Sequence, residues 1–189
     1  MFKKLAKYVK EYKKAAILTP IFVILEVVME VIIPLLMAKI IDVGIQNGDV
    51  HYILEVGGLL IVSAILSLTF GMLSGRFAAK ASAGYAKNLR KEMFHKIQDY
   101  SFENIDKFST SSLVTRMTTD VTNVQMAFQM IIRILVRGPM MMIFALLMVI
   151  SISAKLSLIF FVAIPVLGFI LFYIARKAHP NFERVFKKY

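Results

Sequence analysis

The stretch SFENIDKFSTSSLVTRMTTDV (residues 101–121) lies near the middle of a chain of 189 residues that is 58% hydrophobic. Charged, hydroxyl and amide side chains fill this stretch, so it cannot cross a bilayer, which needs roughly 20 mostly apolar residues. The sequence on both sides is more apolar and has helical periodicity. A polar turn between two long helices is therefore the feature from which the fold is predicted.

Four apolar runs are expected to cross a membrane. The mean hydropathy of the chain is +0.70, and its apolar content exceeds the roughly 45–50% that is usual in soluble domains. The third run is short for a span, so it must borrow residues from the QMIIRILVR segment before it. The four expected spans are residues 15–41, 53–75, 138–153 and 156–175.

The basic residues indicate how these spans are oriented. Of the 23 Lys and Arg residues, all but Lys39 and Lys155 lie before residue 15, between residues 76 and 137, or after residue 175. The positive-inside rule places those three regions in the cytoplasm. The net charge of +11 therefore follows from membrane topology, and no nucleic-acid partner is needed to explain it.

Residues 1–14, MFKKLAKYVKEYKK, predict a helix that lies in the cytoplasmic interface of the membrane. Phe2, Leu5, Val9 and Tyr12 fall on one helical face, and the lysines fall on the other. A disordered basic tail is the alternative interpretation. We expect this elbow helix to precede one membrane domain that covers residues 15–189.

The second and third spans are expected to continue as helices beyond the membrane. Residues 76–99, the outgoing arm, are rich in good helix formers, and only Gly84 weakens their helix propensity. In residues 113–137, the return arm, Leu113, Met117 and Val121 recur at helical spacing. Each arm would project roughly 35 Å at 1.5 Å per residue. Arms of nearly equal length require a compact connection at their far end. A polar tip held so far from the membrane indicates that a partner docks there.

The motif LVTRMTTDV, at the start of the return arm, carries a family resemblance. The family pattern is Leu-x-[Ser/Thr]-Arg-x-x-x-Asp-Val, and the residues that fit it are Leu113, Thr115, Arg116, Asp120 and Val121. The elbow helix, the IID that ends the first span and the RGP that opens the third also match. Over its whole length the chain resembles the transmembrane region of ABC exporters, especially bacterial multidrug-type half-transporters that pair with a different chain. Ser111 and Asn104 depart from the usual glycine and aromatic residue.

This resemblance implies an all-α, polytopic transmembrane helical bundle with long cytoplasmic helix extensions, the arms and tip of residues 76–137, that end in a coupling helix. The coupling helix would seat on a nucleotide-binding domain, and ATP binding and hydrolysis would move it. Phe108 would be its apolar anchor, or would instead pack between the arms. The expected coupling residues are Asn104, Ile105, Asp106, Lys107, Phe108, Ser109 and Thr110. Arg116 and Asp120 are expected to form a local ion pair.

Two acidic residues lie inside the first expected span. Glu26 and Glu30 are one helical turn apart, and a charge at bilayer depth costs about 2.5–3.5 kcal/mol. One interpretation is a substrate-facing patch that favours cationic amphiphiles, and the other is a structural salt bridge to another helix. The residues assigned to the patch are Glu26, Glu30, Phe22, Met29 and Met37. Asp42, at the outer end of the span, either joins an extracellular gate or contacts solvent.

Small residues recur every four positions through the second span and the outgoing arm. We expect them to form one packing seam against another helix. The members of this ladder are Ser63, Ser67, Gly71, Gly75, Ala79 and Ala83.

No motif for chemistry is found. Cysteine is absent, the three His residues are isolated, and there is neither a phosphate-binding loop nor a nucleophile–base pair. We therefore expect no catalytic residue and no metal site in this sequence. The family resemblance implies a nucleotide-binding domain that holds ATP and Mg²⁺, two more spans and a second exporter half, more often a different chain. We accordingly expect the natural chain to continue beyond residue 189.

Two functions from different classes remain open. The first is the transmembrane part of an ATP-hydrolysing exporter in a bacterial plasma membrane. It would move amphiphiles, cationic and drug-like ones in particular, by alternating access, with lipids or peptides as the alternative substrates. The second is a non-enzymatic four-helix membrane scaffold or gated pore.

Overall fold

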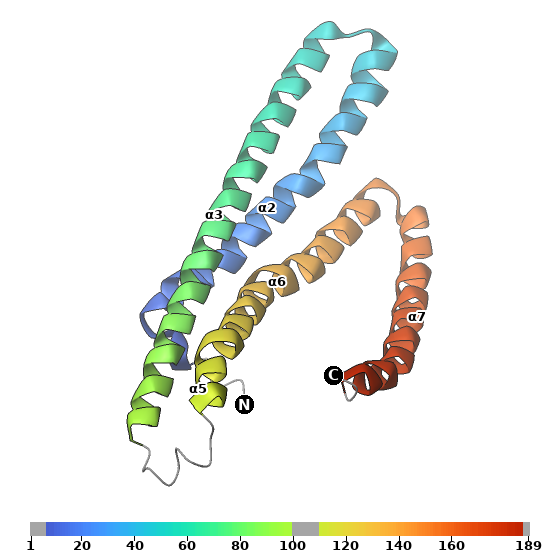
Figure 1. The fold of residues 1–189 in the computed structure, drawn as a ribbon. Helices are drawn as coiled ribbons and strands as arrows, with labels where there is room; N and C mark the ends of the chain where they lie inside the picture. The colour runs from blue at the N-terminus through green and yellow to red at the C-terminus, as the bar shows by residue number, and fades with distance from the viewer. Residues whose placement is uncertain (1–6, 100–109, 187–189) are drawn as a thin grey trace. The chain divides into compact units, whose positions relative to one another are not determined.

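The computed structural model describes residues 7–99 and 110–186. Every regular element in these ranges is helical, which confirms the all-α prediction. The chain forms two compact units, Met1–Met142 and Ile143–Tyr189. Figure 1 labels the helices of both units.

The larger unit is built on a long antiparallel helical hairpin. Helix α2 (Lys13–Lys39) is followed by a π-helical turn, Ile40–Ile45, and then by α3 (Val50–Gln98). Gly48 permits the reversal because its φ of +67° is unfavourable for other residues. Asp49 then caps α3, since its Oδ1 accepts a hydrogen bond from the Tyr52 backbone N–H at 3.0 Å. In Figure 1, α2 lies along the N-terminal part of α3.

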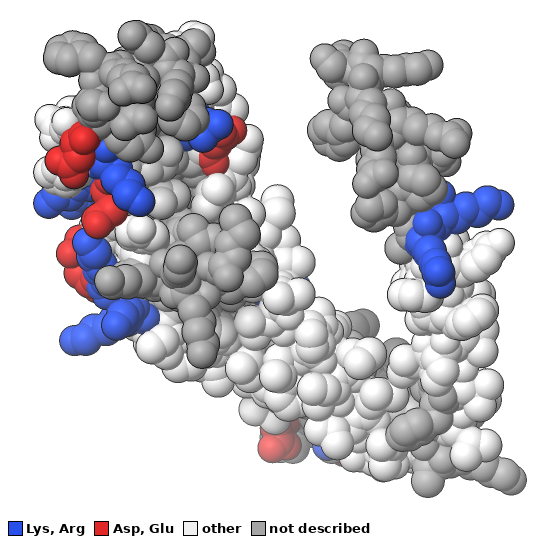
Figure 2. All heavy atoms as spheres, turned by 90° about the horizontal axis from the view of Figure 1, so that it is seen from below, with Lys and Arg blue, Asp and Glu red and all other residues white. Residues whose placement is uncertain are grey.

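Three helical segments in the described ranges are long and apolar enough to cross a membrane: Tyr8–Ile45, Val50–Gln98 and Ser111–Ile152. The chain is therefore a multi-pass membrane protein. In the smaller unit, the helix is interrupted at Ser153. Helix α7 (Ala154–Phe186) follows and contains a shorter apolar stretch, Val162–Ile174. The charged side chains that are visible on the larger unit gather mainly at one end, and most of the rest of its visible surface is uncharged (Figure 2).

Helix α3 is much longer than a span. Its 49 residues are unbroken, which corresponds to roughly 74 Å at 1.5 Å per residue. On the return, α5 (Thr110–Thr115), a π-helical turn (Arg116–Asp120) and α6 (Val121–Ile152) follow one another without interruption. Both arms are therefore continuous with apolar helices.

Side chains from the outgoing arm fasten the return arm at its π-helical turn. Arg90 donates through Nε to the Met117 carbonyl at 3.3 Å and through Nη2 to the Thr122 hydroxyl at 3.1 Å. A π turn inserts one extra residue, so it rotates side chains that an α-helix would keep on one face. Arg116 and Asp120 are the first and last residues of this turn, and the local pair expected from their spacing stays a prediction.

A ring stack makes the second link between the arms. Tyr85 on α3 stacks on Phe128 of α6 with ring centroids 4.7 Å apart and an interplanar angle of 14°. Burial, and to a smaller extent the nearby Tyr8, raises the pKa of Tyr85 above its ordinary value of 10.0. The stacked phenol therefore stays neutral across the physiological pH range.

The elbow segment packs on the outgoing arm. The Asn88 amide donates to the Tyr8 carbonyl at 3.0 Å, and Lys10 pairs with Glu92 at 3.5 Å. The ring of Tyr12 lies so close to Gly84 that a Cβ there would overlap it. Gly84, Asn88 and Glu92 are four residues apart on α3, so together they form one face that receives the elbow.

The elbow is not one continuous helix in the described residues. Its 3-10 turn, Lys7–Tyr12, is kinked at Lys10, where φ is +38°, and α2 begins directly after it at Lys13. Val9 is buried and Tyr12 is half-buried, which shows that this part of the predicted apolar face packs within the protein. Phe2 and Leu5 lie outside the described residues.

The small-residue ladder on α3 does not form a single seam. Residues four apart advance about 400° around a 3.6-residue helix, so a strict ladder drifts by about 40° at each step. Gly71 and Gly75 contact polar side chains of other helices, whereas Ala79 and Ala83 are exposed. The small residues of α3 that are 0% exposed lie on the true helical period and are Ser74, Ala78, Ala81, Ser82 and Ala86.

The close contact between Tyr12 and Gly84 yields a stability prediction. Gly84→Ala should lower the melting temperature of the purified protein, because overpacking costs about 1–3 kcal/mol and exceeds the gain of about 1 kcal/mol in helix propensity. Removing the ring as well, in Gly84→Ala/Tyr12→Ala, should recover part of the loss.

Gly58→Ala is the matched control, since a Cβ at Gly58 meets nothing within 4 Å. It should leave the melting temperature unchanged or raise it. Equal melting temperatures for the Gly84 and Gly58 variants would contradict the packing of the elbow on α3.

Candidate functional site

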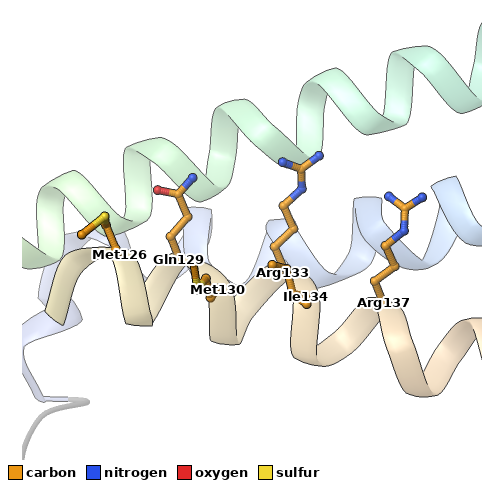
Figure 3. Close-up of a pocket in the computed structure, with 6 residues that line it drawn as sticks. All are labelled: Met126, Gln129, Met130, Arg133, Ile134 and Arg137. Carbon is orange, nitrogen blue, oxygen red and sulfur yellow. The ribbon is translucent and has the colours of Figure 1, made fainter. Parts of the chain in front are cut away.

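Helix α6 carries a row of polar side chains on one face of an apolar segment. Gln129, Arg133 and Arg137 are four residues apart, and all three extend toward α3 and α2 (Figure 3). The backbones of α2 and α3 pack closely together, whereas α6 reaches them through side chains such as these. We call Gln129, Arg133 and Arg137 the polar row.

Arg137 holds both acidic residues of α2. Its Nη1 lies 2.8 Å from Glu26 Oε1, and its Nη2 lies 2.6 Å from Glu30 Oε1. The Ser74 hydroxyl on α3 also lies 3.4 Å from Glu26 Oε2. One guanidinium thus forms ion pairs with two carboxylates in an apolar segment. With all three groups ionised, their net charge is −1.

Burial makes the two carboxylates unequal. The side chain of Glu26 is 10% exposed and that of Glu30 is 29% exposed, while 39% of the Arg137 side chain is exposed. Gly71 leaves room for the buried acid, because a Cβ there would lie 3.1 Å from Glu26 Oε1. Glu26 is therefore the better shielded partner and Glu30 is the more accessible one.

Arg133 occupies the middle of the polar row. Its Nη1 passes Gly75 on α3, where a Cβ would lie 3.9 Å away. Within residues 7–99 and 110–186, no hydrogen bond or salt bridge engages its guanidinium. Gln129 is different, since its Oε1 accepts a hydrogen bond from the Ser82 hydroxyl at 3.2 Å.

A pocket of about 490 Å³ opens along this face of α6. Its volume lies within the roughly 300–1,000 Å³ that is usual for sites of small molecules. The described residues that line it, all shown in Figure 3, are Met126, Gln129, Met130, Arg133, Ile134 and Arg137.

The residues predicted for a substrate patch have different surroundings. Glu26 and Glu30 are brought together by Arg137, which is the structural salt bridge of the second interpretation. Phe22 stacks on Phe77 at 5.5 Å and lies 6.2 Å from Phe70, so it packs between α2 and α3.

The two methionines of the predicted patch contribute less clearly. Met29 is half-buried, and Met37, near the far end of α2, is 51% exposed. Their role in substrate binding stays a prediction.

The predicted coupling residues Asn104–Ser109 lie outside the described residues, and Thr110 begins α5. A cavity of about 110 Å³ lies between the arms, and Met93, Ile97, Leu113 and Arg116 are among the residues that line it. The coupling role therefore stays a prediction. Asp42 is exposed in its π-helical turn, as either of its two interpretations requires. In the described ranges no cluster of potential ligands for a metal ion is found.

Reasoning from sequence identified the acids but missed the polar row. The signal was present in QMIIRILVR, where Gln129, Arg133 and Arg137 fall on one helical face among apolar residues. Two acids four residues apart in one span call for a basic residue at a similar depth in another.

Removing the bridging arginine should destabilise the protein. Arg137→Gln leaves two carboxylates without their cation, which costs about 2–3 kcal/mol. This is less than the 3–5 kcal/mol of a fully buried pair, because 39% of the Arg137 side chain is exposed. The measurement is the melting temperature of the variant and of the unmodified protein, both purified in the same detergent.

Arg133→Gln provides the comparison, because it removes the same charge one turn away without breaking an ion pair. Its melting temperature should stay near that of the unmodified protein. If both variants unfold at the same temperature, the salt bridges do not stabilise the fold.

The amino-acid sequence of the chain is similar to those of known transport proteins. The chain is 35% identical over 185 residues to the ABC transporter ATP-binding protein YfiB of Bacillus subtilis, covering 98% of the chain and 32% of that relative. It is 28% identical over 180 residues to the ATP-dependent lipid A-core flippase of Pseudoalteromonas translucida, covering 94% of the chain and 30% of that relative. The chain spans about one third of the length of these relatives.

The family comparison agrees with the fold. The family model of the ABC transporter transmembrane region matches residues 16–189, which is nearly the whole chain. The same residues form the apolar helices, the two arms and the polar row. The chain therefore belongs to the family of ABC transporter transmembrane regions.

Proposed function

We propose that the chain is the transmembrane part of an ATP-driven exporter that moves amphiphilic molecules by alternating access. The observation that carries the proposal is the unbroken 49-residue α3, which runs from an apolar span into an arm fastened to the return arm. Arg90 and the Tyr85–Phe128 stack stiffen this pair of arms. A displacement at their far end would therefore be passed to the helices that carry the polar row. The relatives support this function through their names, which include an ATP-binding protein and a lipid flippase.

The proposed assembly contains more than this chain. Nucleotide-binding domains would bind ATP and Mg²⁺, and the tip near residues 104–110 would dock on one of them. A second exporter half, more often a different chain, would complete the pathway. The distribution of Lys and Arg supports an N-terminus and arms on the cytoplasmic side of a bacterial plasma membrane.

The acidic pair supports a contribution to substrate choice. With both acids ionised, Glu26, Glu30 and Arg137 together keep one negative charge, and Glu30 is 29% exposed. A cationic headgroup that approaches Glu30 would neutralise that excess. Cationic amphiphiles are therefore proposed as one substrate class.

The coupling role is tested at the tip of the full-length transporter with its partner half, reconstituted in vesicles. Ile105→Ala/Phe108→Ala should lower transport strongly while ATP hydrolysis continues without stimulation by substrate. The reason is that loss of an apolar anchor removes about 2 kcal/mol or more of docking free energy.

The matched control is Phe94→Ala, which removes a 49% exposed ring on the outgoing arm. It should keep both activities. Substrate-stimulated hydrolysis that survives in the tip variant would contradict the coupling role, and so would an equal loss in the Phe94 variant.

Substrate choice is tested with amphiphiles that share one alkyl chain. In Glu30→Gln, the apparent affinity for dodecyltrimethylammonium should fall about fivefold, which corresponds to about 1 kcal/mol for a partly exposed ion pair. The affinity for neutral dodecyl maltoside should not change. ATPase stimulation of the reconstituted transporter gives both values.

Glu55→Gln serves as the control, because Glu55 is exposed on α3 and lies far from Glu30 in sequence. Parallel losses for the cationic and the neutral amphiphile in Glu30→Gln would remove the carboxylates from substrate selection.

A further inference from the structure

We propose that Arg133 forms a subsite for the anionic group, a phosphate or a carboxylate, of an amphiphile bound in the pocket along α6. The inference deepens the proposed exporter function, on which it rests, by assigning a second headgroup charge to the site. It is separate from the acidic pair, which attracts the opposite charge.

The two arginines that line the pocket, Arg133 and Arg137, differ in their partners. Arg137 is satisfied by Glu26 and Glu30 at 2.8 and 2.6 Å. Arg133, one turn away on the same face, has no such partner among the residues that the structure places. Both acids on the neighbouring part of α2 are already engaged, so an anion from outside is the natural partner of Arg133.

The hydrogen bonds of the polar row leave donors in the pocket. Gln129 uses its carbonyl oxygen to accept from the Ser82 hydroxyl, which leaves its amide nitrogen to donate. The guanidinium of Arg133 can only donate. The polar part of the pocket between these two residues therefore offers donors, and a ligand rich in acceptor oxygens fits it. A guanidinium also matches the geometry of phosphate and carboxylate, to which it binds with two parallel hydrogen bonds.

Apolar side chains lie on both sides of Arg133 along the pocket. Met126, Met130 and Ile134 are 49%, 58% and 61% exposed, and all three line the same pocket. Methionine side chains adapt to irregular alkyl chains. A free anion such as inorganic phosphate would leave this surface uncovered, whereas an amphiphile would cover it.

The position of Arg133 along α6 agrees with such a ligand. It lies five residues before Gly138, where the third expected span begins. An arginine at this level reaches the headgroup layer of a bilayer, where anionic lipids and inserted amphiphiles hold their charges. Gly75 keeps the guanidinium from being crowded by α3.

The experiment measures equilibrium binding without ATP, so that its result does not depend on transport. The full-length transporter is placed in nanodiscs of zwitterionic lipid and titrated with dodecyl phosphate or with dodecyl maltoside. Arg133→Gln should weaken the binding of dodecyl phosphate by about tenfold to a hundredfold, as expected for loss of a charge-assisted hydrogen bond. The affinity for dodecyl maltoside should stay the same, and Arg133→Lys should recover part of the loss.

Arg76→Gln is the matched control. Arg76 is exposed, follows Gly75 directly on α3, and does not line the pocket. It should bind dodecyl phosphate like the unmodified protein. An equal loss in the Arg76 variant would overturn the subsite in favour of a general surface charge, and so would equal losses for both amphiphiles in Arg133→Gln.

A second arm of the experiment separates a resident membrane lipid from a transported one. Vesicles that contain fluorescent phosphatidylglycerol are supplied with ATP, and its movement between the leaflets is followed. Movement that depends on ATP and is lost in Arg133→Gln identifies cargo at the subsite. Phosphatidylglycerol that co-purifies through Arg133 but does not move identifies a resident lipid. Both results retain the anionic subsite, and failure of all ATP-driven movement would count only against the exporter function.

Discussion

The arrangement of the larger unit depends on one guanidinium held between two carboxylates. Arg137 on α6 binds Glu26 and Glu30 on α2, residues that lie more than 100 positions earlier in the chain. Each of these charges alone would be costly at bilayer depth, and together they offset one another. Because α6 does not pack its backbone closely on α2 or α3, this pairing is one of the few side-chain contacts that orient α6 about its axis. That rotation in turn presents Gln129 and Arg133 to α3 and forms the pocket.

Side-chain contacts also join α6 to α3 along the arms. Beyond the acidic pair, α6 is joined to α3 by the Ser82–Gln129 hydrogen bond, by the Tyr85–Phe128 stack and by the two bonds of Arg90. The elbow packs on the same stretch of α3, through Gly84 and Asn88. Polar and aromatic contacts of this kind fix the relative position of two helices without a tightly packed apolar seam.

The site that results has charges of both signs at neighbouring levels. The acidic pair with Arg137 is negative by one charge when all three groups are ionised, and Arg133 is positive, so the face between α6 and the hairpin is nearly neutral as a whole. Under the proposed function, such a face would select a ligand by where its charges lie and not by its net charge. Methionines in the pocket add apolar contacts with little demand on shape. This composition is the basis on which amphiphiles, whose charges and alkyl chains are separated, are proposed as substrates.

The sequence by itself determined the helices, because apolar periodicity, capping residues and glycine turns act over a few neighbours. It thereby predicted an all-α membrane protein with two long arms, and it identified Glu26 and Glu30 as residues in need of a partner. It did not determine which arginine forms salt bridges with them, nor which face of α3 is buried. Only the tertiary structure decided these points, because helices of 3.6 residues per turn rotate a four-residue ladder off its face. The choice of Arg137 over Arg133 depends on the axial position and rotation of α6 against α2, which no local pattern encodes.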